Sequence, residues 1–223
     1  EEVFGRTVYL ENDVNCGILG EFEAGAAKGC QTAVGYFVGT GLGGGVIIDG
    51  RLRRGKRGVA GELGHEIVRY NGRRCGCGHK GCLEAYASKT AFGRRFDKLI
   101  NKKGKSSILT DLMGEDFSRL KSKTLAKAYR SGDKVTRKVL KKGMRMLGVG
   151  TANMYAVLSP DCVVYGGGVM EAMGADLMPF IRQGLEEHLF GIGPADVHLA
   201  LSALGDDAVP LGAAIVAQRK GDV

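Results

Sequence analysis

The sequence predicts a soluble α/β protein, and three observations support that fold class. The 37 glycines are too many for a helical bundle, and they gather at 39–45, 72–81 and 166–168, where turns are expected. Short apolar runs of strand length alternate with longer stretches of helical periodicity. The 223 residues are enough for one domain with a sizeable core, or for one domain and part of a second.

The first fifty residues predict a strand, a helix and then a hairpin. Residues 8–10 form a short apolar run that ends at the polar triplet END, and residues 15–27 follow with helical spacing. The run at 33–40 is strand-like, a glycine loop comes next, and the segment VIIDG resumes the extended pattern. We therefore expect two strands joined around the glycine loop.

The remaining apolar periods predict mostly helices, with two further strands. A basic, polar break at 101–107 separates the first two of these helices. The expected helices lie at 88–100, 118–129, about 177–189 and about 209–218, with one long buried helix from Asp133 to Pro160, and the expected strands lie at 162–165 and 197–201.

The formal net charge of +8 raises the question of a nucleic-acid partner. The basic residues lie in a hairpin-like segment at 51–57 and, at helical spacing, between 94 and 142. That spread is typical of a solvated face, or of a general attraction for anionic nucleotides. A dedicated nucleic-acid partner is therefore not favoured.

The sequence predicts a cytoplasmic protein that does not enter a membrane. No window approaches the roughly 18 apolar residues of a membrane-spanning helix, and no charged-then-apolar start resembles a secretory signal. Of the six cysteines, Cys16, Cys30 and Cys162 stand singly in apolar or mixed segments. We expect these three to be reduced thiols, with no disulfide in the chain.

The other three cysteines belong to a metal motif. His65, Cys75, Cys77 and Cys82 have the spacing of a Cys3His zinc site, a closed tetrahedral set that leaves no position for a catalytic water. We therefore expect a structural Zn²⁺, rather than surface thiols that are close by chance. His79 is a weaker candidate for the fourth ligand, because a histidine between two cysteines of a tight loop is usually solvated.

Carboxylates stand beside this motif and at the start of the first helix. Asp13 could accept a proton from a substrate hydroxyl, with Asn12 beside it as a neutral donor and acceptor, or it could simply cap the helix. Glu62 and Glu84 flank the metal loop, which would bring them together, and paired carboxylates of this kind can bind sugar hydroxyls. His65 could present its second ring nitrogen to a ligand hydroxyl.

Two glycine-rich turns offer backbone N–H groups to a phosphate. Gly39, Thr40, Gly41 and Gly43 lie in the first turn, where no bulky side chain would block an anion. That turn lacks the Lys-Ser/Thr ending of a Walker loop and does not open a helix, and an ordinary hairpin is its plain alternative. Gly166, Gly167 and Gly168 follow a buried strand, where a nucleotide site and a tight strand-to-helix turn are equally compatible with the pattern.

Taken together, the segments ENDVN, GTGLGGGVIIDG, AGELGH, CGCGHKGCLE, YGGGV and GDDAVPLGAA resemble the ROK family of repressors, open reading frames and kinases. The resemblance covers residues 8 to about 218, and its zinc motif is specific. It implies an actin-like ATPase, RNase H-like fold of the sugar kinase–Hsp70 superfamily, in which two lobes close over a sugar and ATP.

The resemblance also implies roles for particular residues. Asp13 matches the general base that takes the proton from the attacking sugar hydroxyl. The family's sugar contacts correspond here to Asn12, Gly41, Glu62, His65 and Glu84. Its phosphate loop corresponds to Thr40 with the neighbouring glycines, and its adenosine-binding segment corresponds to residues 166–168. ATP with Mg²⁺ and a hexose are the implied substrates, and a dimer or tetramer is the implied assembly.

The chain departs from the family pattern at its start. ROK kinases begin with a lobe that carries an Asp-x-Gly-Gly-Thr phosphate loop, and no segment here matches it. We therefore expect the chain to be the larger second lobe at 1–204, with the zinc loop at 65–82 and a terminal helix segment at 205–223 that packs on the first lobe. Alone, such a chain should have little or no kinase activity.

The sequence is compatible with three functions. A hexose kinase is favoured, because a sugar-responsive repressor with a helix-turn-helix would need sugar binding but no base such as Asp13. A zinc module that binds nucleic acid is the third reading, and the carboxylates around the metal motif argue against it. Within the kinases, AGELGH resembles the glucokinase version, which makes glucose the first choice of substrate, with N-acetylglucosamine or N-acetylmannosamine next.

Overall fold

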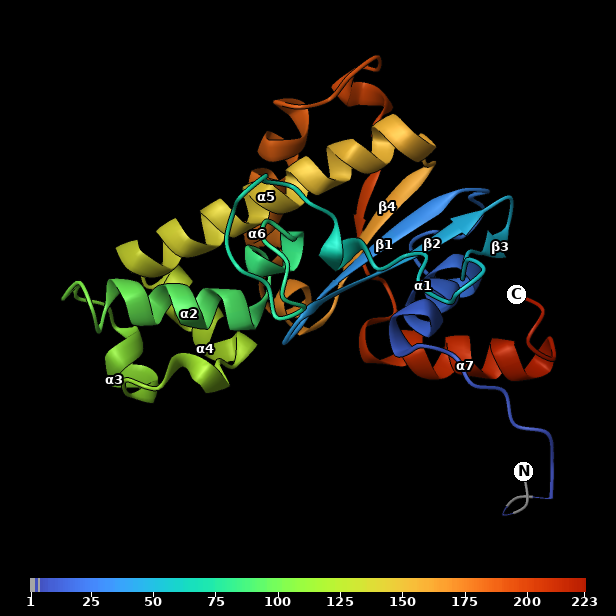
Figure 1. The fold of residues 1–223 in the computed structure, drawn as a ribbon, viewed down its shortest axis with the longest axis horizontal. Coiled ribbons are helices and arrows are strands. Elements are labelled where there is room, and N and C mark those ends of the chain that lie inside the picture. Colours follow the sequence, from blue (N-terminus) through green and yellow to red (C-terminus); the bar gives the residue numbers. More distant parts are fainter. Residues whose placement is uncertain (1–2, 4) are drawn as a thin grey trace.

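A mixed five-stranded sheet forms the centre of the fold (Figure 1). The computed structural model describes residue 3 and residues 5–223 of the chain. The strands are β1 (Ala33–Val38), β2 (Leu42–Ile48), β3 (Arg51–Leu52), β4 (Cys162–Gly166) and β5 (Leu199–Leu201), in the order β3-β2-β1-β4-β5. The first three pair antiparallel, whereas β4 lies parallel to both β1 and β5.

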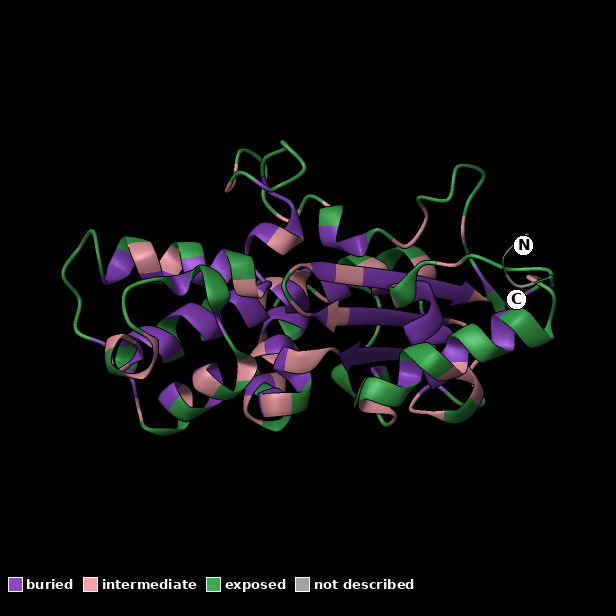
Figure 2. Ribbon diagram, turned by 90° about the horizontal axis from the view of Figure 1, so that it is seen from below, coloured by how far each residue is buried: buried purple, intermediate pink, exposed green. Residues whose placement is uncertain are grey.

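Helices cover both faces of this sheet and extend past one end of it (Figures 1 and 2). They are α1 (Asp13–Ala24), α2 (Lys89–Leu99), α3 (Leu109–Met113), α4 (Ser122–Arg130), α5 (Lys134–Leu158), α6 (Gly168–Glu186) and α7 (Ala208–Gln218). The α1–α7 pair packs on one face and the α5–α6 pair on the other, while α2, α3 and α4 lie together at the far end of the molecule. The predicted α/β class is confirmed.

The central strand β1 is buried on both faces, which explains its nearly continuous apolar sequence. Val34, Tyr36 and Val38 point into the core under α5 and α6, whereas Ala33 and Phe37 point into the core under α1 and α7. Successive side chains on a strand alternate between its faces, so one run of six residues serves two cores.

The long helix α5 agrees closely with its prediction. Asp133 is its N-cap and accepts a hydrogen bond from the backbone N–H of Thr136, and the helix ends at Leu158, two residues before Pro160. Within the described part of the chain, neither α5 nor any other helix combines the length and apolarity that a membrane crossing requires.

The predicted strand at 8–10 is wrong. These residues are exposed and have no regular secondary structure, and they lie outside all five strands of the described sheet. A short apolar run becomes a strand only where a neighbouring strand can pair with its backbone, and local sequence does not supply that neighbour.

The glycine loop is also shorter than the sequence predicts. Gly43, Gly44 and Gly45 belong to β2, and the turn spans only residues 39–41. A Cβ at these three positions would come within 2.4 Å of Val14, 2.6 Å of Leu63 and 2.7 Å of Ile18, respectively. The glycines therefore allow α1 and the loop before the metal motif to pack directly on the strand.

The helices α3, α4 and α6 differ from the prediction. The structure places α6 nine residues earlier than the expected start at 177, because it begins at Gly168 directly after β4. A short 3-10 turn at Phe117–Arg119 precedes α4, so the expected helix at 118–129 is divided, and α3 had no predicted counterpart. The terminal helix α7 packs against α1, and the lobe division at 204 stays a prediction.

Candidate functional site

A polar cleft of about 460 Å³ opens at the carboxyl ends of β1 and β4, the edge of a parallel pair where α/β proteins bind ligands. The hairpin turn, the start of α1 and the metal loop form its walls. Its lining residues are Asn12, Asp13, Val14, Phe37, Gly39, Thr40, Gly41, Leu42, Gly43, Gly44, Glu62, His65, Glu84 and Gly167. All of the predicted sugar contacts are therefore brought together in one cleft.

The structure of the start of α1 bears on the two roles considered for Asp13, helix cap or proton acceptor. Asn12 is the N-cap of the helix, and its side-chain oxygen accepts hydrogen bonds from the N–H groups of Val14 and Asn15 at 2.9 and 3.2 Å. Asp13 is the first residue of the helix, and its exposed carboxylate accepts from Val14 at 2.9 Å. Because Asn12 performs the capping, the Asp13 carboxylate can face a ligand in the cleft.

Glu11 is a residue of this site that the sequence reasoning missed. Its carboxylate accepts from the Asn12 N–H at 3.0 Å and the Asn15 side chain at 2.8 Å, and it pairs with Arg54. Burial opposes ionisation of Glu11, but the hydrogen bonds from Asn15 and Arg54 outweigh it and lower the pKa. Its position inside the ENDVN segment was the available signal.

The pair between Glu11 and Arg54 joins two walls of the cleft. Arg54 lies in the loop that leads from β3 to Glu62, and its carbonyl accepts a hydrogen bond from the Ala60 N–H at 3.1 Å. Glu11 precedes the Asn12-Asp13 turn. The ion pair therefore ties the segment that carries Asp13 to the loop that carries Glu62.

The hairpin turn is held in place from α2. The carbonyl of Gly39 accepts from the Lys89 N–H at 3.0 Å, and the carbonyl of Thr40 accepts from the Thr90 N–H and hydroxyl at 3.1 and 2.8 Å. With its carbonyls engaged behind it, the turn presents a rigid backbone to the cleft.

Glu84 connects this turn to the metal loop. One of its carboxylate oxygens accepts from the Leu42 N–H at 3.1 Å, and the other accepts from the Cys75 thiol at 3.3 Å. Glu62 lies across the cleft with an exposed side chain that has no hydrogen-bond partner among the described residues. Glu84 is thus fixed, and Glu62 can orient toward a ligand.

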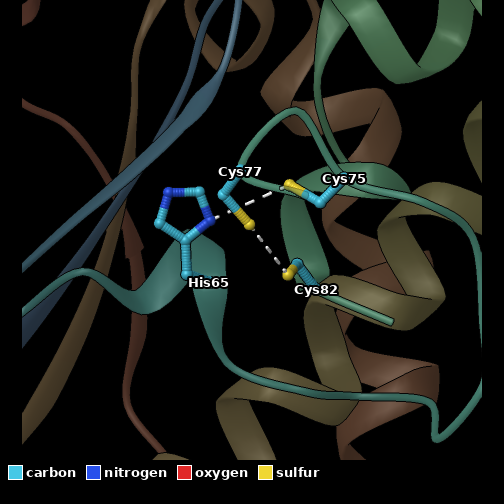
Figure 3. A group of neighbouring side chains, drawn as sticks. All are labelled: His65, Cys75, Cys77 and Cys82. Carbon is cyan, nitrogen blue, oxygen red and sulfur yellow. Dashed lines mark hydrogen bonds between the residues drawn. The ribbon is translucent and has the colours of Figure 1, made fainter. Parts of the chain in front are cut away.

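The four predicted metal ligands converge (Figure 3). One donor atom from each of His65, Cys75, Cys77 and Cys82 lies within 4.8 Å of the others. The Cys77 and Cys82 sulfurs are 3.6 Å apart, close to the ~3.8 Å expected between thiolates at ~2.3 Å from one tetrahedral zinc. His79 lies outside this set, exposed, with its Nδ1 3.5 Å from the Cys77 sulfur.

The thiol chemistry of this cluster suits a divalent cation. Burial raises the pKa of Cys75 to about 12, so without a cation it remains a neutral donor to Glu84. Hydrogen bonds from the backbone and ring of His79 lower the pKa of the exposed Cys77 to about 6. A metal binds thiolates and displaces such protons, so the donor set and its spacing fit Zn²⁺.

Only one residue of the second glycine turn reaches the cleft. Gly167 has a φ of +81°, and a Cβ there would lie 2.9 Å from the backbone of Val38, so glycine is needed at this position. Gly166 instead packs against Phe37, and Gly168 lines a neighbouring hollow of about 630 Å³ between α4 and α6. The start of α6 therefore lies between the two depressions.

The sheet order and this cleft define the class of protein. The fold is that of actin-like ATPases as found in ROK sugar kinases, and the ROK family model matches residues 1–220. The chain belongs to the ROK family.

Particular relatives include both kinases and repressors. The glucokinase of Thermotoga maritima is 37% identical over 218 residues, which cover 97% of this chain and 68% of that protein. A solved ROK glucokinase from Streptomyces griseus, in complex with glucose and AMPPNP, matches with a TM-score of 0.86 and 33% identity over 98% of this chain and 70% of that one. The xylose repressor of Caldicellulosiruptor bescii is 29% identical over 95% of this chain and 52% of that protein.

Proposed function

We propose that the complete gene product is an ATP-dependent hexose kinase, with glucose as its first substrate, and that this chain supplies its sugar-binding cleft. The observation that carries this proposal is the cleft itself, in which a carboxylate at a helix start faces Glu62, His65 and Glu84 beside a rigid glycine turn. The similarity to glucokinases supports the reaction class, and the solved relative that holds glucose and AMPPNP supports the pair of substrates.

In this mechanism Asp13 is the general base. It takes the proton from the attacking sugar hydroxyl, and its negative charge is stabilised at the start of α1. Asn12, Glu62, His65 and Glu84 bind the other hydroxyls, so that the reacting oxygen is held in line with the γ-phosphate. Phosphoryl transfer depends mainly on such positioning and on charge neutralisation.

The phosphates of ATP would lie along the backbone of the Gly39–Gly41 turn and near Gly167, where no side chain blocks the approach of an anion to the backbone N–H groups. The hollow beside Gly168 offers the apolar surface of Ala126 and Ala172 to adenosine, and Lys121, Lys123 and Lys127 beside it could contact the phosphates. Mg²⁺ bound to ATP would supply neutralisation of charge on the transferred group.

His65, Cys75, Cys77 and Cys82 would hold a structural Zn²⁺, which supplies no step of the reaction. The metal would fix the loop that positions His65 and Glu84, since zinc ligation and loop folding are coupled. The second ring nitrogen of His65 would then face the sugar.

The substitution Asp13→Asn in the complete gene product tests this mechanism. It keeps the size and the helix-start geometry but removes the base, so kcat should fall by about 10²–10⁴-fold with little change in glucose binding. Asp49→Asn is the matched control, because Asp49 is an exposed carboxylate at the β2–β3 turn with a φ of +54°, which asparagine tolerates. Retention of activity by Asp13→Asn would reject Asp13 as the base.

A sugar-responsive repressor is the second candidate, because the family includes repressors. Such a protein needs the sugar site but no base, and the free carboxylate of Asp13 favours the kinase. Sugar-dependent operator binding by the complete gene product, with no ATP turnover, would reverse this preference. A panel of glucose, N-acetylglucosamine and N-acetylmannosamine under one kinase assay would identify the substrate.

A further inference from the structure

A second, strongly basic hollow lies outside the proposed active site. This basic cavity, of about 240 Å³, is formed between the metal loop and α2. Two alanines and five cationic side chains line it: Arg73, Arg74, Arg94, Arg95 and Lys98. It lies behind the 3-10 turn Leu83–Ala85, since Ala85 lines the basic cavity and Glu84 lines the cleft.

Carboxylates lie near the basic cavity but do not pair with its cations: Asp97, Glu115 and Asp116 line an adjoining hollow together with Arg94 and Lys98. In the described part of the chain, none of its five cations forms an ion pair. The nearest carboxylate along α2, Asp97, is instead engaged by Lys102 at 3.2 Å and Asn101 at 3.1 Å. Three thiolates on one Zn²⁺ would contribute a single net negative charge, which does not offset five cations.

Arg73 is held in a defined orientation at the back of the basic cavity. Its guanidinium stacks over the ring of buried Tyr86 at 4.7 Å and donates to the carbonyl of Ala85 at 3.3 Å. Its backbone N–H donates to the Tyr86 hydroxyl at 2.8 Å. A guanidinium fixed in this way is organised in advance for a ligand, unlike a mobile surface arginine.

The surroundings extend this positive field. Burial, followed by the charges of Arg73, Arg69, Arg95 and Lys138, lowers the pKa of Lys142 on α5. All four of the charged groups that act on Lys142 are cations, so the field comes from like charges on the metal loop, α2 and α5.

We propose that the basic cavity binds the phosphate group of a small anion. Several arginines around one hollow provide the paired N–H donors that match phosphate oxygens. Its volume is below the roughly 300–1,000 Å³ of sites for drug-sized ligands, which fits inorganic phosphate or a phosphorylated monosaccharide. This site does not depend on the proposed kinase activity.

Titration calorimetry of the complete chain tests the proposal without sugar or ATP. Inorganic phosphate and glucose 6-phosphate are titrated separately at constant ionic strength, with chloride as the reference anion. We expect saturable binding of one anion per chain, weakened at least tenfold by Arg94→Gln with Arg95→Gln. If glucose 6-phosphate binds more tightly than inorganic phosphate, the ligand is a phosphorylated sugar. If the two bind equally, the basic cavity recognises the phosphate group alone and free phosphate is the ligand.

The control variant Lys28→Gln with Lys56→Gln removes the same charge from exposed positions that form no ion pair with any described residue. These positions follow α1 and β3, which lie away from α2 in the molecule (Figure 1). It should bind phosphate as the unaltered chain does. Equal weakening in both double variants would overturn the proposal, because bulk charge alone would then explain binding. Binding that AMPPNP displaces and that Arg94→Gln with Arg95→Gln leaves unchanged would also overturn it, since the anion would then occupy the cleft.

Discussion

Replacing one fully buried carboxylate, Glu21, should destabilise the protein more than any exposed charge change. Glu21 is 0% exposed near the end of α1. One oxygen accepts from the backbone N–H groups of Ala26 and Ala203 at 2.7 and 3.2 Å. The other accepts from the Ser202 hydroxyl and the Leu204 N–H at 2.5 and 2.9 Å. Glu21 therefore joins α1 to the segment after β5.

The substitution Glu21→Gln leaves only one oxygen for these four donors. In its better orientation the new amide faces Ser202, whose hydroxyl can turn to accept, and Leu204, whose N–H cannot. The Leu204 N–H, which is part-buried, loses a bond to a charged acceptor, worth about 1.5–3 kcal/mol. We therefore expect a loss of about 1.5–3 kcal/mol in the free energy of unfolding, out of the roughly 5–15 kcal/mol typical of a domain.

Equilibrium unfolding in urea measures this loss, provided that the denaturant slope is unchanged. Glu23→Gln is the matched control on the same helix, because Glu23 pairs with Arg219 near the surface at 2.7 Å. A surface pair contributes about 0–1 kcal/mol, so this control should stay close to the unaltered protein. A Glu21→Gln protein within about 1 kcal/mol of the control would refute the reasoning.

Three further predictions concern the metal loop, a helix cap and the cleft. Cys77→Ser should lower zinc content and melting temperature together, whereas Cys30→Ser outside the loop should retain zinc; unchanged zinc content in Cys77→Ser would remove Cys77 from the ligand set. Burial opposes ionisation of Asp133, but hydrogen bonds from the first turn of α5 and from residues 107–108 outweigh it and hold the pKa of Asp133 below 3.8. The stability that ionised Asp133 adds to the fold is therefore complete above pH 3.8, and it is lost as the pH falls through the lower pKa of the folded state. Asp133→Ala should therefore lower the free energy of unfolding by about 2 kcal/mol near pH 7. The difference in melting temperature between the variant and the unaltered protein should narrow below pH 3.8, and a difference that stays constant would contradict this role of the Asp133 carboxylate. If the proposed kinase reaction holds, Glu11→Gln should lower kcat/KM by about tenfold, by loosening Arg54 and the Asn12 segment, and Arg54→Lys, which keeps a cation opposite Glu11, should lose less; an unchanged kcat/KM in Glu11→Gln would contradict this role.

Local pattern predicted much of the fold. Amphipathic periodicity located α5 and its cap Asp133, and the apolar runs located β1 and β4, because these signals are contained within each segment. The strand predicted at 8–10 failed because strand formation needs a pairing partner elsewhere in the chain. The misread glycines 43–45 serve close packing against α1 and the loop before the metal motif, and sequence pattern alone cannot distinguish that use from a turn.

The sequence by itself determined the family motifs, the four candidate metal ligands and the carboxylates that line the cleft, since each is marked by residue type and spacing. Only the tertiary structure decided that Asn12 rather than Asp13 caps α1, and that Gly166 and Gly168 stay outside the cleft. It also decided three of the four partners of Glu21, which lie 181 to 183 positions away along the chain. Burial and hydrogen bonding between distant segments follow from packing, and packing is a property of the whole chain rather than of any short segment.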